Sequence, residues 1–234
     1  MTAPYVSIVV PVYNEEKSLQ PLMDRLYPVA QALGRPFEII FTNDGSRDRS
    51  LEMLRGYVQR YPGVKVVEFN GNFGQHMAIL AAFERSSGEI VITLDADLQN
   101  PPEEIPRMVA AIESGHDVVG TIREKRQDPL FRRVASRIVN ITTNKMTGMQ
   151  MSDYGCMLRG YHRNIINNTN QCGESTTFIP ALAQTFSSNP TEIMVGHAER
   201  TLGESKYSFY RLIRLNFDLM TGFSVVPLPL FALL

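Results

Sequence analysis

Short runs of apolar and β-branched residues alternate with segments of helical spacing through the first half of the chain. The runs have the composition of buried strands and span residues 6–10, 37–42, 64–69, 90–94 and 117–122. Between them, apolar residues recur three or four positions apart in the segments 19–33, 51–61, 75–86 and 103–114. This alternation predicts an α/β fold with a mostly parallel central sheet and helices on both faces.

The chain departs from this alternation beyond residue 123. The pattern there predicts a helix over residues 131–146, a short apolar stretch at 153–160, a helix at 178–186 and a short strand at 192–197. We therefore expect one main domain over residues 1–205, with a first half at 1–122 and a second half at 123–205.

The last segment of the chain, residues 206–234, has the pattern of an amphipathic helix followed by an apolar tail. One stripe of the helix is apolar and the other is mostly basic, with Arg211 and Arg214. The tail, residues 223–234, is shorter than the roughly 20 residues that a membrane-spanning helix needs. Such a helix more often packs on its own domain, but the apolar tail favours a helix at a membrane surface that leads into a truncated membrane segment.

Charge and cysteine content exclude one class of function and indicate the compartment of the protein. Lys and Arg number 23 and Asp and Glu 24, and the resulting net charge of −1 argues against a nucleic-acid-coating protein. The two cysteines form no disulfide framework, which indicates a reducing compartment. The N-terminus has no basic segment followed by an apolar core, so we expect no signal peptide.

Polar residues follow four of the predicted strands, at 13–15, 43–45, 70–74 and 95–97. In an open parallel sheet the carboxyl ends of the strands meet at one crevice, where ligands bind. Asn, Asp and Gly at a single strand end often form only a turn, but four such ends favour a polar pocket that suits a nucleotide. The glycine motifs of dinucleotide-binding domains and P-loop proteins are absent from the sequence.

The pair Asp95 and Asp97 is the candidate metal site. Residues two apart on an extended chain point the same way, and Mg²⁺ is typically held by one or two carboxylates together with substrate phosphates and water. The plainer interpretation is a solvated turn, and Asp95 could instead contact a ribose or stabilise that turn.

Four stretches resemble glycosyltransferases of family 2, which have the GT-A fold: residues 6–15 (VSIVVPVYNE), 44–46 (DGS), 72–75 (NFGQ) and 94–103 (LDADLQNPPE). Further stretches resemble the polyprenyl-phosphate glycosyltransferases within that family: residues 118–123 (VVGTIR), 153–159 (DYGCMLR), 175–180 (STTFIP) and 197–207 (HAERTLGESKY). The resemblance covers nearly the whole chain. It departs from the family at Asn43, where the first of two aspartates usually stands.

The resemblance implies an inverting, metal-dependent transfer of a sugar from a UDP-sugar to undecaprenyl or another polyprenyl phosphate. It implies Mg²⁺ or Mn²⁺ as cofactor, held by Asp97, Asp95 and Gln99. It also implies that residues 1–122 bind the nucleotide, with Pro11, Tyr13, Glu15, Asp44, Asn72 and Asp95 as contacts. The nearest sugar within the family is 4-deoxy-4-formamido-L-arabinose, and glucose from UDP-glucose or mannose from GDP-mannose stays open.

The same resemblance assigns residues 123–205 to the acceptor. Cations suited to a lipid phosphate near a membrane surface are Arg123, Arg137, Arg200 and Lys206. Asp153 stands where relatives with hydroxyl acceptors keep a catalytic carboxylate, and here it would orient the sugar or an arginine. The implied location is the bacterial inner membrane, with the catalytic domain on the cytoplasmic face.

Several alternatives stay open from the sequence. A nucleotidyltransferase would also use strand-end carboxylates and a metal, and a non-catalytic module could bind nucleotide sugars or lipid phosphates at a membrane. A homo-oligomer is likewise open. His76 could contact the sugar or simply be a packed histidine.

Overall fold

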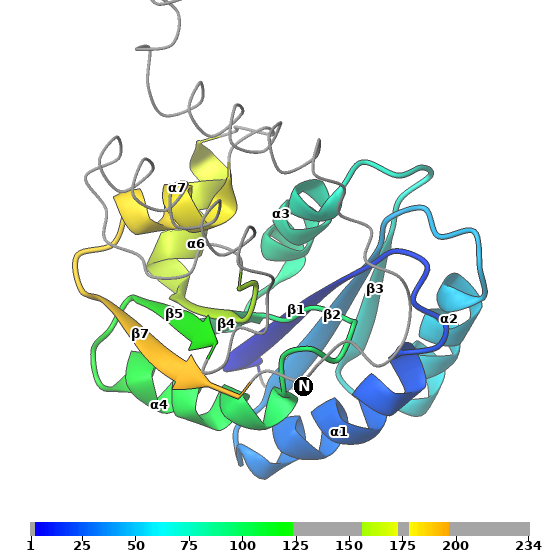
Figure 1. The fold of residues 1–234 in the computed structure, drawn as a ribbon, viewed down its shortest axis with the longest axis horizontal. Helices are drawn as coiled ribbons and strands as arrows, with labels where there is room; N and C mark the ends of the chain where they lie inside the picture. Colours follow the sequence, from blue (N-terminus) through cyan, green and yellow to red (C-terminus); the bar gives the residue numbers. More distant parts are fainter. Residues whose placement is uncertain (1–2, 124–155, 173–177, 197–234) are drawn as a thin grey trace, which may run out of the picture.

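The structure is a computed structural model that describes residues 3–123, 156–172 and 178–196 (Figure 1). Its strands are β1 (Val6–Val12), β2 (Phe37–Asn43), β3 (Val64–Glu68), β4 (Ile90–Thr93), β5 (Val118–Arg123), β6 (Arg159–His162) and β7 (Pro190–Val195). Its helices are α1 (Leu19–Ala32), α2 (Ser50–Arg60), α3 (Gln75–Arg85), α4 (Ile105–Glu113), α6 (Arg163–Gln171) and α7 (Ile179–Thr185), with a 3₁₀ turn η1 (Pro102–Glu104) before α4.

The strands form one mostly parallel sheet in the order β3-β2-β1-β4-β6-β5-β7, as the alternation of the sequence predicts. The exception is β6, which lies antiparallel between β4 and β5. At Gly160 in β6 a Cβ atom would lie 2.9 Å from the Ile112 side chain and 3.1 Å from that of Ile92, so only glycine lets α4 pack this closely over the strand.

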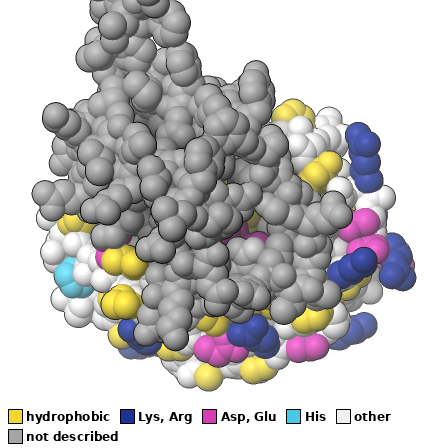
Figure 2. All heavy atoms as spheres, in the orientation of Figure 1, with side chains coloured by type: hydrophobic (Ala, Val, Ile, Leu, Met, Phe, Trp, Pro, Cys, Tyr) yellow, Lys and Arg dark blue, Asp and Glu magenta, His cyan; other side chains and the backbone are white. Residues whose placement is uncertain are grey.

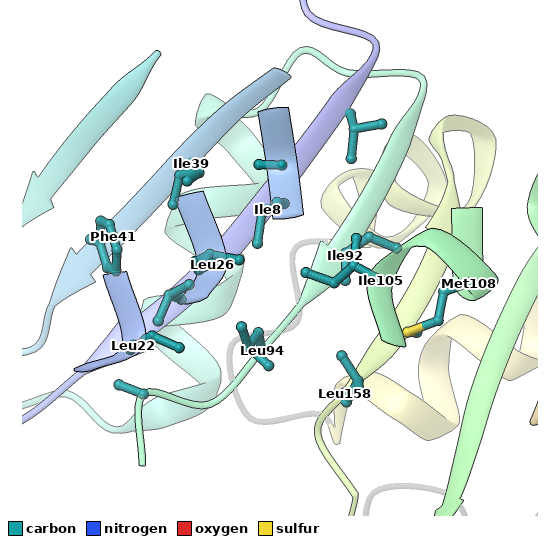
Figure 3. Packing of buried hydrophobic residues seen from close by; sticks show 14 of the residues in the cluster. Ile8, Leu22, Leu26, Ile39, Phe41, Ile92, Leu94, Ile105, Met108 and Leu158 are labelled. Atoms are coloured by element: carbon teal, nitrogen blue, oxygen red, sulfur yellow. The ribbon is translucent and has the colours of Figure 1, made fainter. Parts of the chain in front are cut away.

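Helices cover both faces of the sheet (Figure 1). One buried apolar cluster joins the sheet to α1, α2 and α4, and Figure 3 shows side chains of this cluster from α1, α4 and the strands. A second cluster joins the opposite face to α3, α6 and α7. Helix α1 contains Pro28 and continues through that residue to Ala32. The helix α6 was not predicted, because its sequence is rich in asparagine and carries few apolar positions.

The parallel strands place their carboxyl ends at one edge of the sheet. Val12 at the end of β1 is in register with Asn43 at the end of β2. Thr93 at the end of β4 is in register with Val9 of β1. The loops that follow β1, β2 and β4 therefore start next to one another, which is the geometry expected of a ligand-binding edge.

The surface of the described residues carries charges of both signs. Figure 2 shows Lys and Arg side chains interspersed with Asp and Glu, and several of them form exposed ion pairs, such as Arg25 with Glu103 at 2.8 Å. Among the described residues, no helix has the length and apolar character needed to span a membrane. The predicted amphipathic helix and apolar tail of residues 206–234 lie outside the described residues, as does most of the predicted acceptor half.

Candidate functional site

Asp44, the first residue after β2, joins the loop after β2 to the loop after β3 by hydrogen bonds. One carboxylate oxygen accepts a hydrogen bond from the Phe73 amide at 2.6 Å. The other accepts from the Gly74 amide and from the Asn72 carboxamide, both at 2.9 Å. Burial raises the pKa of Asp44, and the bonds from the two amides only partly offset this effect. Asp44 thus fixes the loop that leads into α3.

The loop after β1 is held by the loop after β2. The backbone amides of Asn14, Glu15 and Glu16 donate to the side chains of Ser46, Ser50 and Asp48, at 3.1, 2.9 and 3.1 Å respectively. Burial by itself would raise the pKa of Asp48, but hydrogen bonds from Ser50 and from the Glu16 amide outweigh it and lower that pKa. These contacts hold the half-buried Tyr13 and Glu15, two of the predicted nucleotide contacts, in one place.

The loop after β4, residues 94–101, is called the carboxylate loop below. Its first four residues alternate between buried and partly exposed. Leu94 and Ala96 are buried in the core, while Asp95 and Asp97 between and after them are half-buried. The alternation therefore directs both acids away from the core. Leu98 has a φ of 64°, a left-handed conformation that is unfavourable for leucine. This turn brings the Gln99 amide to Oδ1 of Asp97 at 3.1 Å.

The start of α3 reaches this carboxylate loop. The Gln75 carboxamide donates to Oδ1 of Asp95 at 2.7 Å. Because Gln75 follows Gly74, whose amide is bound to Asp44, one short segment connects the acid after β2 with the first acid after β4. Sequence reasoning placed both acids at strand ends but gave no role to Gln75.

A buried polar group supports the other end of the carboxylate loop. Thr121 in β5 donates to the Leu158 carbonyl at 2.7 Å and to the Cys156 sulfur at 2.9 Å. The Cys156 thiol in turn lies 3.4 Å from the side-chain oxygen of the buried Asn100. Asn100 directly follows Gln99, so this group anchors the loop where it leaves the site.

An open hollow of about 430 Å³ lies at the ends of β2 and β3, between the loops that follow these two strands. Residues from the ends of β2 and β3 and from the loops after them line it, and Asn43, Ser46, Arg47, Phe69 and Asn72 are among them. Asn43 is itself buried, and its side-chain oxygen accepts a hydrogen bond from the Ser46 amide at 3.4 Å. The hollow is large enough for part of a nucleotide or a similar polar ligand.

His76 packs at the start of α3. Its ring stands edge-on to Phe178, with the ring centres 5.6 Å apart. Its buried Nδ1 atom has no hydrogen-bond partner among the residues that the structure describes. Burial lowers the pKa of His76. These contacts describe a packed imidazole, and the alternative role, a contact to the sugar, stays a prediction.

The lowered pKa of His76 has a consequence for stability. The unfolded chain takes up a proton near pH 6.5 that the folded chain resists, so the folded state loses stability as the pH falls below that value. In a His76→Leu variant, we expect a smaller loss of unfolding free energy between pH 7.5 and pH 5.5 than in the wild type. Urea titrations at both pH values measure this difference. Equal losses in the two proteins would contradict it.

The other predicted site residues divide into two groups. Pro11 lies in β1, one residue before its end, and Asn72 and Gln99 lie on loops at the carboxyl edge of the sheet. Arg123 ends β5, so its backbone also reaches that edge. Asp153, Arg137, Arg200 and Lys206 lie outside the described residues.

The arrangement at this edge suits a divalent cation bound together with an anionic ligand. No group of three or more His, Cys, Asp or Glu side chains that could hold a metal occurs within the described part of the chain. A pair of carboxylates is nevertheless the usual protein contribution for Mg²⁺, because substrate phosphates and water supply the remaining oxygens. Asp95 and Asp97 provide such a pair.

Comparison with known proteins agrees with this geometry. The model of the family Glycosyl transferase family 2 matches residues 7–169. An undecaprenyl-phosphate 4-deoxy-4-formamido-L-arabinose transferase of Pseudomonas fluorescens is 52% identical over 98% of the chain and 68% of the relative. The protein of the same name from Serratia proteamaculans is 53% identical over 96% of the chain and 69% of the relative.

Solved structures share the fold at low identity. Glucosyl-3-phosphoglycerate synthase of Mycobacterium tuberculosis, in complex with Mn²⁺, UDP-glucose and phosphoglyceric acid, has a TM-score of 0.67 at 16% identity, over 93% of this chain and 79% of that one. The same enzyme with Mg²⁺ and UDP has a TM-score of 0.69 at 15% identity, over 94% and 79%. The predicted GT-A fold is confirmed. Since the family model spans most of the sequence and the curated relatives align along nearly all of it, the chain belongs to glycosyl transferase family 2.

Proposed function

We propose that the chain transfers a sugar from a UDP-sugar to undecaprenyl phosphate or another polyprenyl phosphate, with inversion at the anomeric carbon. The observation that carries the proposal is that Asp44, Asp95 and Asp97 all follow strands at one edge of the sheet, where the start of α3 connects Asp44 with Asp95. The UDP and UDP-glucose named for the M. tuberculosis enzyme support the donor class. The names of the relatives support the lipid phosphate acceptor and favour 4-deoxy-4-formamido-L-arabinose as the sugar.

Asp95 and Asp97, with Gln99 beside them, would hold a Mg²⁺ or Mn²⁺ ion together with the diphosphate of the donor. Both acids are half-buried at a strand end and directed away from the core, which fits a cation that needs oxygen ligands and access to substrate. When bound, the ion neutralises negative charge on the departing nucleoside diphosphate. Tyr13, Glu15 and the loops joined by Asp44 would hold the nucleoside in place.

The attack by the lipid phosphate requires little acid–base catalysis from the protein. A lipid phosphate is already anionic near neutral pH, so its oxygen can attack the sugar without a general base. The remaining task is to align the acceptor with the sugar and to balance its charge. We assign this task to Arg123, Arg137, Arg200 and Lys206, with Asp153 orienting the sugar or one of the arginines. Residues 206–234 would then hold the domain against the cytoplasmic face of the inner membrane.

A panel of donors with one short polyprenyl phosphate tests the proposal. We expect a lipid-linked sugar and release of UDP from UDP-4-deoxy-4-formamido-L-arabinose, with smaller or no turnover of UDP-glucose and GDP-mannose. EDTA should abolish the turnover, and added Mg²⁺ or Mn²⁺ should restore it.

Other outcomes of the panel would overturn parts of the proposal. Release of pyrophosphate in place of a nucleoside diphosphate would identify a nucleotidyltransferase. Tight UDP binding without turnover on any lipid phosphate would identify a binding module. Preferred turnover of UDP-glucose or GDP-mannose would replace the assigned sugar and leave the acceptor class in place.

A further inference from the structure

We propose that Gln75 is a positioning residue for the metal site, because its side chain fixes the carboxylate of Asp95. This inference rests on the proposed function, which makes Asp95 a metal ligand. Its geometric basis is the hydrogen bond from Nε2 of Gln75 to Oδ1 of Asp95, which is 2.7 Å long and joins residues 20 positions apart. A bond of this length to an ionised carboxylate is among the stronger side-chain interactions.

The donor side of this hydrogen bond is itself held firmly. The amides of Phe73 and Gly74, directly before Gln75, both donate to Asp44. Directly after it, α3 packs on β1 and β2 through buried residues that include Ala78 and Ile79. Gln75 is therefore fixed on both sides, and its amide group is presented to Asp95 at a defined position.

The backbone around Asp95, which accepts this hydrogen bond, is anchored by contacts other than the one from Gln75. Leu94 and Ala96, on either side of Asp95, are buried in the core and anchor the backbone of the loop. The bond from Gln75 acts on the carboxylate itself, at a half-buried position. It can therefore fix the direction of an oxygen ligand, because partners of this kind orient the side chains that bind the metal in many metal sites.

The segment of residues 72–75 also connects Asp44, after β2, with Asp95, after β4. Asp44 binds residues 72–74 of the segment, and residue 75 binds Asp95. A change at Gln75 should accordingly alter the part of the nucleotide affinity that depends on the metal and leave the metal-independent part unchanged.

Calorimetric titration of UDP into the whole chain, with Mn²⁺ and without it, tests the inference. Gln75→Met keeps the length of the side chain but cannot donate a hydrogen bond. We expect this variant to lose about 10- to 100-fold in affinity for UDP with Mn²⁺ and to keep the wild-type affinity without metal. The electron paramagnetic resonance spectrum of the bound Mn²⁺ should change in the same variant, since a ligand has moved.

Two matched variants separate positioning from a merely structural role. Gln20→Met removes a bond of the same kind and the same 2.7 Å length, between Gln20 and Asp24 on α1. It also removes the bond that Gln20 accepts from Tyr57, far from the strand-end loops after β3 and β4, and should leave both affinities at the wild-type level. In an Asp95→Ala background, Gln75→Met should cause no further loss, because the two residues would act as one unit.

Three results with the variants would overturn the inference. They are equal losses of affinity with and without Mn²⁺ in Gln75→Met, additive losses in the double variant, and wild-type affinity in Gln75→Met under both conditions. A wild-type protein whose UDP affinity does not respond to Mn²⁺ would overturn the metal assignment and this inference together. Failure of lipid transfer alone, with the expected UDP affinities, would count against the proposed acceptor and still support the role of Gln75.

Discussion

Asp97→Asn is expected to reduce sugar transfer by about 10³-fold or more while the protein stays folded. The substitution keeps the size of the side chain and an oxygen that can accept the Gln99 amide, which lies 3.1 Å from Oδ1 in the structure. It removes the negative charge that would hold the cation against the donor diphosphate. The initial rate of UDP release with a saturating lipid phosphate measures the effect, and circular dichroism checks the fold.

Asp24→Asn is the matched control for this variant. Asp24 is exposed on α1, where it accepts a hydrogen bond from Gln20 and takes no part in the strand-end loops. We expect transfer at the wild-type rate in this control. An Asp97→Asn protein that keeps more than about a tenth of the wild-type rate would contradict the assignment of Asp97 to the metal, since loss of one such interaction usually has a larger effect.

Gly45→Ala is expected to disrupt the hollow at the ends of β2 and β3, which Gly45 lines, and to lower the free energy of unfolding by about 2–4 kcal/mol. Gly45 has a φ of +66°, and a Cβ atom there would lie 2.4 Å from the carbonyl carbon of Gly71 and 2.7 Å from the amide nitrogen of Asn72. These contacts are with backbone, so no side-chain rotation can relieve them. The loops that Asp44 joins would have to separate, and UDP affinity should fall with stability.

Gly34→Ala separates the clash at Gly45 from the strain of its backbone. Gly34 has a nearly equal φ of +62°, but a Cβ atom there would meet nothing within 4 Å. We expect about 1–2 kcal/mol of destabilisation and unchanged UDP affinity, from the left-handed conformation alone. Urea titration and calorimetry of the two variants provide the comparison. Equal changes in unfolding free energy and in UDP affinity at both positions would show that the close approach of the loops at Gly45 affects neither quantity.

The acids at the strand ends were predicted from short-range patterns in the sequence. Asp44, Asp95 and Asp97 each follow a run of apolar residues, and the ends of parallel strands share one edge of the sheet. The structure places these acids on adjoining loops, as expected. Their roles toward nucleotide and metal stay predictions, because the described contacts are within the protein. For Asp44 those contacts reveal a structural task that the sequence did not suggest, since it binds the segment before α3.

The residues that support the site could not be found from the sequence. Ser50 binds the Glu15 amide 35 positions away, and Gln75 binds Asp95 20 positions away. No sequence pattern distinguishes Ser50 from the other serines. Gln75 belongs to the stretch 72–75 that resembles the family, but the resemblance does not indicate which residue its side chain binds. Their partners are set by which loops the sheet brings together, and that is a property of the folded chain.

The local sequence by itself determined the alternation of strands and helices, the parallel sheet between two helical layers and the acids at its carboxyl edge. These follow from apolar periodicity and from turn-forming residues, which act over a few neighbouring positions. Only the tertiary structure decided that β6 runs antiparallel between β4 and β5, that Asp44 holds the start of α3, and that Gln75 reaches Asp95. These features depend on contacts between distant segments, whose free energy is gained only when the whole sheet has formed.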